Sequence, residues 1–558
     1  MTHPWIKNYP SWVRPNLKFD DYNSIPEILE QSFNRYSDKD AFHNMGTTLT
    51  YGEIERLSAD FASYLQNDLG LKKGDRVALM MPNILQYPIA LFGLLRAGLT
   101  AVNVNPLYTA RELEHQLNDS GAETIVLFSN SAHILEEVFA RTKVKNVVLT
   151  QIGDMLKFPK NHIVNFVIKN VKKMVPDFNI PGAISFKDAL SKGAKNTYTP
   201  GELSQSDVAF LQYTGGTTGV SKGAILSHGN ILANMMQARE WIKENIVDGK
   251  EILITPLPLY HIFSLTANCF VFSSVGALNI LITNPRDMPG FIKELAKWKF
   301  TAFTGVNTLF NGLTNHKDFS KLDFSKLHIS LGGGMAVQKS VAKKWKDMTG
   351  CTLVEAYGLT ETSPAACINP LDLEEYNGFI GLPISDTVVE IRDDENNTLE
   401  YGPENVGEIC IKGPQVMKGY WNRPEETKKV MTDDGFFRTG DLGFMTEDGF
   451  TKIVDRKKDM ILVSGFNVYP NEIEEVVTTH DKVFECAAVG VSDEKSGEVV
   501  KLFVVKGDES LTEKELLAFC KENFTGYKVP KFIEFRKELP KTPVGKILRK
   551  DLRVKIAS

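Results

Sequence analysis

The sequence predicts an α/β protein with a large N-terminal domain of layered α/β sheets and a small α+β C-terminal domain. Two observations lead to this prediction. Apolar runs typical of buried strands alternate with stretches of helical period along most of the chain, which favours layers of largely parallel sheet. The chain of 558 residues also exceeds the ~250–300 residues at which a single hydrophobic core stops growing.

In the N-terminal part, residues 76–81 and 122–128 are apolar runs that read as buried strands. Stretches of helical period lie between these two runs, at 84–97 and 110–117. A further strand is expected at 208–212, directly before a run rich in glycine and threonine. This order of elements is typical of α/β layers.

A change of pattern marks a β-rich subdomain, which we expect at about 384–450. Short alternating strands with turn signals occupy 384–412, and the last hundred residues then carry a pattern of their own. The charged stretch Asp455–Asp459 is a natural joint between them. We therefore expect an N-terminal domain at 1–457 and a C-terminal domain at 458–558, the latter with helices at 471–479 and 512–523 and strands at 485–491 and 499–505.

Composition narrows the functional class. Hydrophobic residues make up 42% and charged residues 24%, as in an ordinary globular protein, and a net charge of −5 gives no electrostatic reason to expect nucleic acid as a partner. The six scattered cysteines suit reduced thiols. We find neither a signal-peptide pattern nor an apolar run of about 18 residues, so we expect a cytoplasmic protein.

The first candidate site is the loop Tyr213–Gly223. Its glycines allow a tight turn and close approach to a ligand, and consecutive backbone N–H groups in such a turn form an anion-binding concavity. Threonine and serine hydroxyls and Lys222 add donors and charge. The loop is not a Walker A motif, because Lys222 is followed by glycine. A plain surface loop is the alternative, and the other motifs of the chain favour phosphate binding.

Four short motifs follow in a fixed order. They are Tyr357–Thr362, Phe437–Asp441, Val454–Asp459 and Pro540–Ile547. Together with the glycine–threonine loop, this ordered set resembles the adenylate-forming superfamily of acyl-CoA synthetases, luciferases and peptide-synthetase adenylation domains. The resemblance covers about residues 25–552. It is closest to bacterial long-chain fatty acid–CoA ligases, through segments 256–263, 331–336, 433–441 and 453–470.

The resemblance implies the adenylate-forming enzyme fold and two half-reactions. A carboxylate first attacks the α-phosphorus of ATP and releases pyrophosphate, and the thiol of coenzyme A then attacks the acyl-adenylate. The implied partners are a fatty acid, ATP and coenzyme A, with Mg²⁺ as the metal. Such transfers need positioning and charge stabilisation more than covalent help.

Residue by residue, the resemblance implies that the loop holds the β- and γ-phosphates and that Glu361 and the Thr214 hydroxyl bind Mg²⁺. It implies that Asp441 accepts the ribose hydroxyls, that Arg456 contacts ribose and phosphate, and that Tyr357 stacks on adenine. A surface charge for Glu361 and a turn role for Asp441 are the alternatives. The complete set of nucleotide-binding candidates is Tyr213, Thr214, Gly215, Gly216, Thr217, Thr218, Gly219, Lys222, Gly333, Gly334, Met335, Tyr357, Gly358, Thr360, Asp441 and Arg456.

Lys546 is the candidate catalytic residue of the first half-reaction, because an ammonium can neutralise charge that develops on the α-phosphate and the carboxylate. A solvated surface lysine is the alternative. The resemblance places a hinge at Lys458, about which a mobile C-terminal domain rotates. One orientation would present Lys546 to the site, and the other would present the loop around Gly465 on the coenzyme A side.

Four further residues concern the acyl group. His261 is expected to position the carboxylate or to be purely structural, and not to act as a base, because a fatty acid is already ionised at neutral pH. Phe263, Val306 and Ala356 are candidate walls of the acyl pocket, with ordinary core as the equal alternative. The long-chain preference rests on the resemblance.

Residues 163–178 combine apolar residues at helical spacing with Lys169, Lys172 and Lys173. Such a basic amphipathic helix can lie on an anionic membrane, which would place the protein peripherally on the inner face. Packing of this face against the protein's own core is the alternative that we favour. The oligomeric state, including a homodimer, is left open.

Three rival functions remain. A peptide-synthetase module is disfavoured, because this sequence continues for only twelve residues after Lys546. An acyl-AMP ligase, or a ligase for medium-chain or aryl acids, shares the same first half-reaction. A catalytically inactive ligand-binding homologue should lack Lys546, Glu361 or Asp441, and all three are present.

Overall fold

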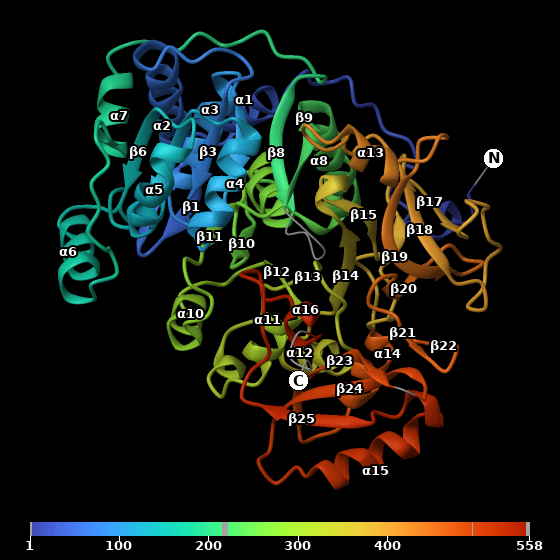
Figure 1. Ribbon diagram of the computed structural model, residues 1–558. Helices are drawn as coiled ribbons and strands as arrows, with labels where there is room; N and C mark the ends of the chain where they lie inside the picture. The colour runs from blue at the N-terminus through green and yellow to red at the C-terminus, as the bar shows by residue number, and fades with distance from the viewer. Residues whose placement is uncertain (1–2, 215–220, 494, 554–558) are drawn as a thin grey trace.

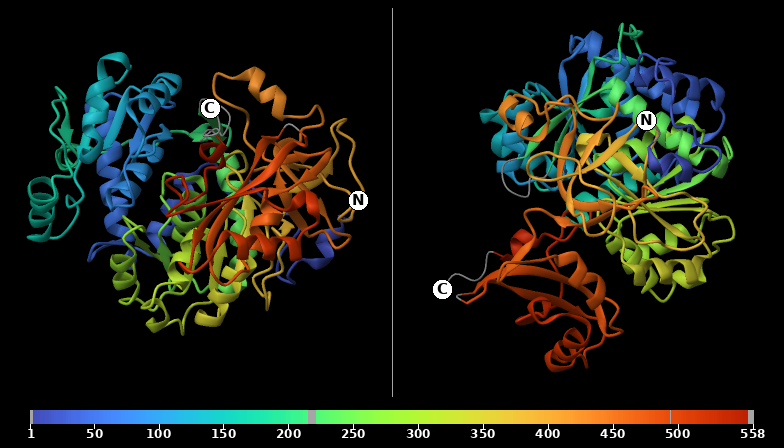
Figure 2. Two further views of the ribbon diagram at one scale, coloured as in Figure 1. Left: turned by 60° about the horizontal axis from the view of Figure 1, so that its bottom comes forward. Right: turned by 90° about the vertical axis from the view of Figure 1, so that its right-hand side faces the viewer.

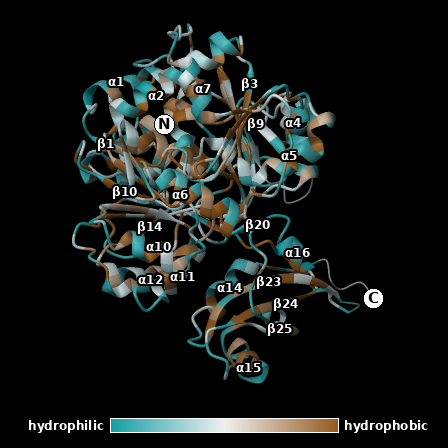
Figure 3. Cartoon of the chain, turned by 90° about the vertical axis from the view of Figure 1, so that its left-hand side faces the viewer, coloured by the Kyte–Doolittle hydropathy of each residue, from teal (hydrophilic) through white to brown (hydrophobic). Residues whose placement is uncertain are grey.

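The computed structural model describes residues 3–214, 221–493 and 495–553. Figure 1 and the right-hand view of Figure 2 show a large N-terminal body with a small C-terminal domain attached below it. The described strands form four sheets, three in the large body and one in the small domain. Figure 3 shows strands of both parts, such as β3 and β24, in hydrophobic colour among hydrophilic loops. The predicted α/β class with a separate small C-terminal domain is confirmed.

The first sheet has seven strands in the order β7-β6-β5-β3-β4-β8-β9, and all neighbours are parallel except the antiparallel pair β8–β9. Its central strands are buried along their whole length, as expected for a parallel sheet covered by helices on both faces. The strands are β3 (Arg76–Met80), β4 (Thr100–Asn103), β5 (Thr124–Phe128), β6 (Asn146–Thr150), β7 (Ile184–Ser185), β8 (Val208–Thr214) and β9 (Lys222–Ser227).

The second sheet has nine strands in the order β16-β15-β14-β13-β12-β10-β11-β1-β2. Its middle is parallel, and antiparallel pairs occur towards both edges. The strands are β1 (Asp40–Asn44), β2 (Thr47–Thr50), β10 (Ile252–Thr255), β11 (Leu278–Leu281), β12 (Ala302–Gly305), β13 (Ile329–Gly332), β14 (Leu353–Gly358), β15 (Ala365–Ile368) and β16 (Leu382–Pro383).

Helices cover these two sheets, and several carry clear start and stop signals. Thr109 and Glu112 form a capping box at the start of α4, and Gly121 ends the helix with a left-handed backbone. The helices of the large body are α1 (Ile25–Arg35), α2 (Tyr51–Ser63), α3 (Gln86–Arg96), α4 (Ala110–Ser120), α5 (Ala132–Val138), α6 (Lys160–Phe166), α7 (Phe186–Gly193), α8 (His228–Ile242), α9 (Phe272–Ser274), α10 (Met288–Leu295), α11 (Asn307–Thr314), α12 (Lys339–Thr349) and α13 (Pro424–Val430).

The third sheet is antiparallel and lies where we expected the β-rich subdomain. Its order is β17 (Val388–Arg392), β18 (Gly407–Lys412), β19 (Phe437–Met445) and β20 (Thr451–Arg456). Along β19, buried and half-buried residues alternate strictly, so the strand shows one face to the core. Asn230 and Gln237 of α8 donate hydrogen bonds to carbonyls of this region, which ties the third sheet to the large body.

The C-terminal domain has its own sheet and core. The sheet order is β22-β21-β24-β23, with β25 added in parallel to β24. Residues such as Ile461, Leu502 and Leu516 form a separate buried cluster. The elements are β21 (Ile461–Val463), β22 (Phe466–Val468), α14 (Pro470–Val477), β23 (Val483–Asp493), β24 (Gly497–Lys506), α15 (Glu513–Asn523), β25 (Phe532–Arg536) and α16 (Arg549–Arg553).

One expectation about packing is wrong. The segment 163–178 does not pack its apolar residues against the core: Ile163, Phe166, Val171 and Met174 are each more than half exposed. It is also a shorter helix than its periodicity indicated, since α6 continues as a π-helical turn that ends at Val171. Figure 1 shows α6 at the edge of the large body. None of the helices in the described ranges has both the length and the apolar character that crossing a bilayer requires.

Candidate active site

A cavity of about 2150 Å³ lies between the large body and the C-terminal domain. Its walls bring together candidate residues from almost every motif of the sequence. Those that line it are Tyr213, Thr214, Lys222, His261, Phe263, Val306, Gly333, Gly334, Met335, Ala356, Tyr357, Gly358, Thr360, Glu361, Asp441, Arg456, Lys458 and Lys546.

The glycine–threonine loop connects the antiparallel strands β8 and β9. Thr214 pairs with Lys222 across this hairpin, so both ends of the loop open into the cavity. Lys222 forms a 2.6 Å ion pair with Glu426 of α13, and its ammonium lies 5.1 Å from the ring centre of Tyr420. The candidates Gly215, Gly216, Thr217, Thr218 and Gly219 lie outside the described residues.

Asp441 anchors one wall of the cavity. The hydroxyl of Tyr357 donates to Asp441 Oδ2 at 2.7 Å, and Arg456 Nε lies 2.8 Å from Oδ1. Strands β19 and β20 bring Asp441 and Arg456 together, because these residues are direct cross-strand partners. The 3% exposure of Asp441 and its two fixed partners make it a rigid carboxylate within the nucleotide-binding candidates.

Glu361 is a buried carboxyl on the turn that follows β14. Burial raises its pKa, and a hydrogen bond from the Tyr420 hydroxyl to Oε1, 2.6 Å long, opposes this rise. Tyr420 in turn lies on a segment that pairs with β9, since its backbone bridges to Ala224. Tyr420 therefore connects Glu361 to strand β9 of the β8–β9 pair.

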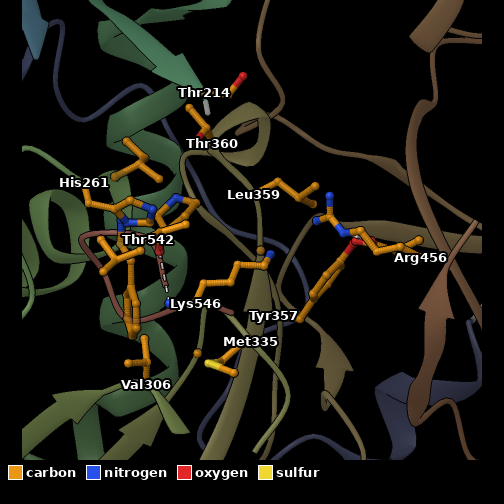
Figure 4. Close-up of a pocket in the computed structure, with 18 of the residues that line it drawn as sticks. Thr214, His261, Val306, Met335, Tyr357, Leu359, Thr360, Arg456, Thr542 and Lys546 are labelled. Atoms are coloured by element: carbon orange, nitrogen blue, oxygen red, sulfur yellow. Dashed lines mark hydrogen bonds and ion pairs between the residues drawn. The ribbon is translucent and has the colours of Figure 1, made fainter. Parts of the chain in front are cut away.

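Lys546 reaches the cavity on a tight turn of the C-terminal domain (Figure 4). Gly545 N donates to Thr542 O at 2.9 Å, Lys546 N donates to Thr542 Oγ1 at 3.0 Å, and Gly545 takes the positive φ of +87° that the turn requires. Burial, followed by the positive charge of Arg456, lowers the pKa of Lys546 to about 8. In Figure 4 its side chain extends between His261 on one side and Tyr357 and Arg456 on the other.

His261 is neutral at physiological pH. Burial, followed by the positive charge of Lys546, lowers its pKa to about 4. The backbone N–H of Phe263 points at its Nδ1 at 3.4 Å, so Nδ1 is the acceptor and Nε2 carries the proton. A neutral imidazole of this tautomer is a hydrogen-bond donor through Nε2 and does not need to act as a base.

An apolar pocket opens from the same cavity. Leu257, Phe263 and Val306 form its buried cluster, and Met335 packs against them. Glycine at 333 keeps it open, because a Cβ there would lie 3.1 Å from the ring of Phe263. Ala356 also lines the cavity. The candidate wall residues are thus gathered on one side of the site.

Lys458 and Gly465, the two residues assigned to domain movement, differ in their position relative to the cavity. Lys458 lines the cavity at the junction of the domains, and burial lowers its pKa. Gly465 lies in the exposed turn between β21 and β22 and is absent from the cavity wall. The structure therefore has the orientation in which Lys546, and not Gly465, faces the site.

Glu355 and Tyr420 are two of the cavity residues that sequence reasoning missed. Glu355 is buried in β14, burial raises its pKa to about 8, and the hydroxyl of Tyr376 donates to it at 2.9 Å. A glutamate in an otherwise apolar strand, two residues before Tyr357, was a usable signal. Tyr420, the partner of Glu361, carried none, because 59 residues separate the two in the chain.

Comparisons with known proteins match this architecture. Residues 29–421 match the family model described as AMP-binding enzyme, and residues 472–546 match the AMP-binding enzyme C-terminal domain. The chain is 57% identical over 553 residues to a long-chain-fatty-acid–CoA ligase of Salmonella typhimurium, covering 99% of this chain and 98% of that protein. A protein of the same name from Haemophilus influenzae is 54% identical over 552 residues, with 98% of each chain covered.

Solved structures include similar folds. The crystal structure of ATP-bound MatB from Rhodopseudomonas palustris matches with a TM-score of 0.81 at 26% identity, over 95% of this chain and 98% of that one.

Proposed function

The chain belongs to the AMP-binding enzyme family, and from this premise we propose that it is a long-chain fatty acid–CoA ligase. It activates a fatty acid with ATP as the acyl-adenylate and passes the acyl group to coenzyme A. The observation that carries the proposal is one cavity that combines the Lys546 turn, the Asp441–Tyr357–Arg456 group and the apolar pocket of Phe263 and Val306.

In the first half-reaction, a carboxylate oxygen forms a bond to the α-phosphorus while the bond to the β-phosphate bridging oxygen breaks, and pyrophosphate leaves. Lys546 neutralises negative charge on the α-phosphate and the carboxylate. The Nε2–H of neutral His261 donates to the carboxylate and holds it in line. Asp441 accepts the ribose hydroxyls, and Tyr357 and Arg456 fix the nucleotide beside it.

We assign Mg²⁺ to Glu361 and the Thr214 hydroxyl, where it would shield phosphate charge. The donor set fits, because carboxylate and hydroxyl oxygens are the ligands that Mg²⁺ prefers. Burial raises the pKa of Glu361, so this carboxyl lacks full compensation for its charge and would gain from a cation. The Tyr420 hydroxyl fixes the orientation of the carboxylate.

In the second half-reaction, the sulfur of coenzyme A bonds to the acyl carbon, the bond to the AMP oxygen breaks and the thiol proton is released. We propose that rotation about Lys458 withdraws Lys546 and brings the turn of Gly465 to the cavity. The exposed position of Gly465 supports this proposal, because a turn at the surface of the small domain can come into contact with the large body.

The test is an acid panel. AMP release is measured with fatty acids from acetate to oleate and with aryl acids, with and without coenzyme A. We expect the highest kcat/KM with long-chain acids, thioester as product, and loss of adenylate formation in Lys546→Ala with thioester formation from supplied adenylate retained. Acyl-adenylate as the final product even with coenzyme A present would instead indicate an acyl-AMP ligase, and preference for aryl acids would reject the long-chain assignment.

We also propose that the enzyme contacts an anionic membrane through α6 and the turn that follows it. Phe158 just before α6, and Ile163, Phe166, Val171 and Met174 on and after it, are exposed, between 52% and 81%. Five lysines flank them in the sequence, namely Lys157, Lys160, Lys169, Lys172 and Lys173. Exposed apolar side chains in a basic segment complement an anionic bilayer surface.

Co-sedimentation with vesicles that contain anionic phospholipid tests the contact. We expect the triple variant Lys169→Glu, Lys172→Glu, Lys173→Glu to lose most binding, since each lysine near the surface contributes about 1 kcal/mol. The control reverses the same number of charges on and beside α10, at Lys293, Lys297 and Lys299. Equal binding by wild type and both variants would reject the proposal.

A further inference from the structure

Among the described residues, side-chain hydrogen bonds join the C-terminal domain to the large body at two places. Next to the hinge, Asn471 N donates to Asp455 Oδ2 at 2.8 Å, and Arg549 lies 3.5 Å from the same carboxylate. The second place is α11, on the far side of the cavity from β20. There Thr308 Oγ1 donates to Gly545 O at 3.0 Å, and Asn311 Nδ2 donates to Phe484 O at 3.0 Å.

The two donors lie on the same face of α11. Thr308 and Asn311 are three residues apart, so their side chains lie together on the helix surface. They bind two separate segments of the small domain, the Lys546 turn and the start of β23. Both acceptors are backbone carbonyls, so the contact fixes the main chain of the small domain directly.

The Lys546 turn sits tightly against this helix. A Cβ on Gly545 would lie 2.7 Å from Thr308 Oγ1 and 3.4 Å from Val306 Cγ2. Glycine is therefore required at 545 by close approach as well as by its positive φ. The hydrogen bond from Thr308 ends on the residue directly before Lys546, so it holds the backbone from which the Lys546 side chain extends.

We propose that Thr308 and Asn311 are positioning residues that dock the C-terminal domain in the Lys546-inserted orientation and so serve the first half-reaction alone. This rests on the proposed two-step reaction. Rotation that carries Gly465 to the cavity moves Gly545 and Phe484 away from α11 and breaks both bonds. The two hydrogen bonds from Thr308 and Asn311 contribute to adenylate formation and have no part in thioester formation.

The test measures the two half-reactions separately in single turnovers: pyrophosphate release from ATP and oleate, and thioester formation from supplied oleoyl-adenylate and coenzyme A. Thr308→Val keeps the shape and removes the donor. We expect it and Asn311→Ala each to slow pyrophosphate release about three- to tenfold, as for one lost hydrogen bond, with thioester formation unchanged or faster.

Thr352→Val is the matched control. Thr352 is half-buried like Thr308 and donates to a carbonyl at 2.9 Å, but its partner Glu374 belongs to the same domain. The control should leave both rates unchanged. Equal slowing of both steps in Thr308→Val, or no slowing of pyrophosphate release, would overturn the proposed positioning role of Thr308 and Asn311. A wild-type enzyme that makes no adenylate from any acid would instead overturn the proposed function.

Discussion

At the scale of single residues, burial sets the charges of this cavity. It lowers the pKa of Lys546 to about 8 and that of His261 to about 4, and it raises that of Glu355 to about 8. Each shift has the direction that desolvation gives, against the charged form. Lys546 therefore loses its positive charge just above neutral pH. His261 is already neutral there, because its pKa is about 4.

A pH dependence follows from this arrangement. The ammonium of Lys546 is present below about pH 8 and is lost above it, so kcat/KM for adenylate formation should fall as pH rises through this value. His261 adds no change between pH 6 and 9, because its pKa is about 4. The profile is measured by pyrophosphate release, with Lys546→Arg as the control that keeps its charge and lacks the decline. A wild-type profile that stays level to pH 9.5 would contradict the assignment.

At the scale of elements, strand ends and tight turns bring the site together. The end of β14 carries Tyr357 and leads into Glu361, while β19 and β20 pair Asp441 with Arg456. Close backbone packing fixes the turn that follows β14. A Cβ on Gly358 would lie only 1.9 Å from the carbonyl oxygen of Pro364. Because that neighbour is backbone, a side chain at 358 must displace the turn itself.

Gly358→Ala should therefore disturb both Tyr357 and Glu361. We expect kcat/KM for ATP to fall at least about tenfold, as for a misplacement of about 1 Å in a binding site. Gly201→Ala is the matched control, since no atom lies within 4 Å of a Cβ at that position and its φ is not positive. The test measures initial rates of AMP release over a range of ATP concentrations. Wild-type rates in Gly358→Ala would contradict the prediction, because the turn would then accept a side chain without moving Tyr357 or Glu361.

At the scale of the whole molecule, the site is complete only when the two domains meet. Lys546 belongs to the small domain, whereas Asp441, Glu361 and His261 belong to the large body, and all line one cavity. The joint passes through Lys458, where the Arg553 guanidinium donates to the backbone carbonyl at 3.4 Å. A substitution that changes the backbone freedom of this joint therefore changes how the two domains are oriented, and it leaves Asp441, Glu361 and His261 in place.

Lys458→Pro fixes one backbone angle of the joint. We expect it to change the two half-reactions by different factors, with thioester formation reduced more, because the structure already holds Lys546 in place and the second step requires rotation. Lys458→Ala removes the side chain but leaves the backbone free, so it should keep the ratio of the two rates. The single-turnover assays that separate pyrophosphate release from thioester formation measure both. An unchanged ratio in Lys458→Pro would argue against a hinge here.

Much of the fold and the candidate site could be predicted because the signals are local. Buried strands such as β5 are continuous apolar runs, and glycines mark the turns where the chain must bend sharply or approach another segment. The ordered motifs likewise named residues that line one cavity, from Thr214 to Lys546. The amphipathic segment 163–178 misled because periodicity reports an apolar face but not what covers it, and here the face is exposed.

The sequence by itself thus determined the fold class, the family resemblance and a set of candidate residues, most of which line the cavity. Only the tertiary structure decided which orientation the small domain takes and what holds it there. Thr308 and Gly545 are 237 residues apart in the chain, and Asn311 and Phe484 are 173 apart. Contacts of this kind depend on the packing of whole domains against each other, and no local pattern of side chains encodes them.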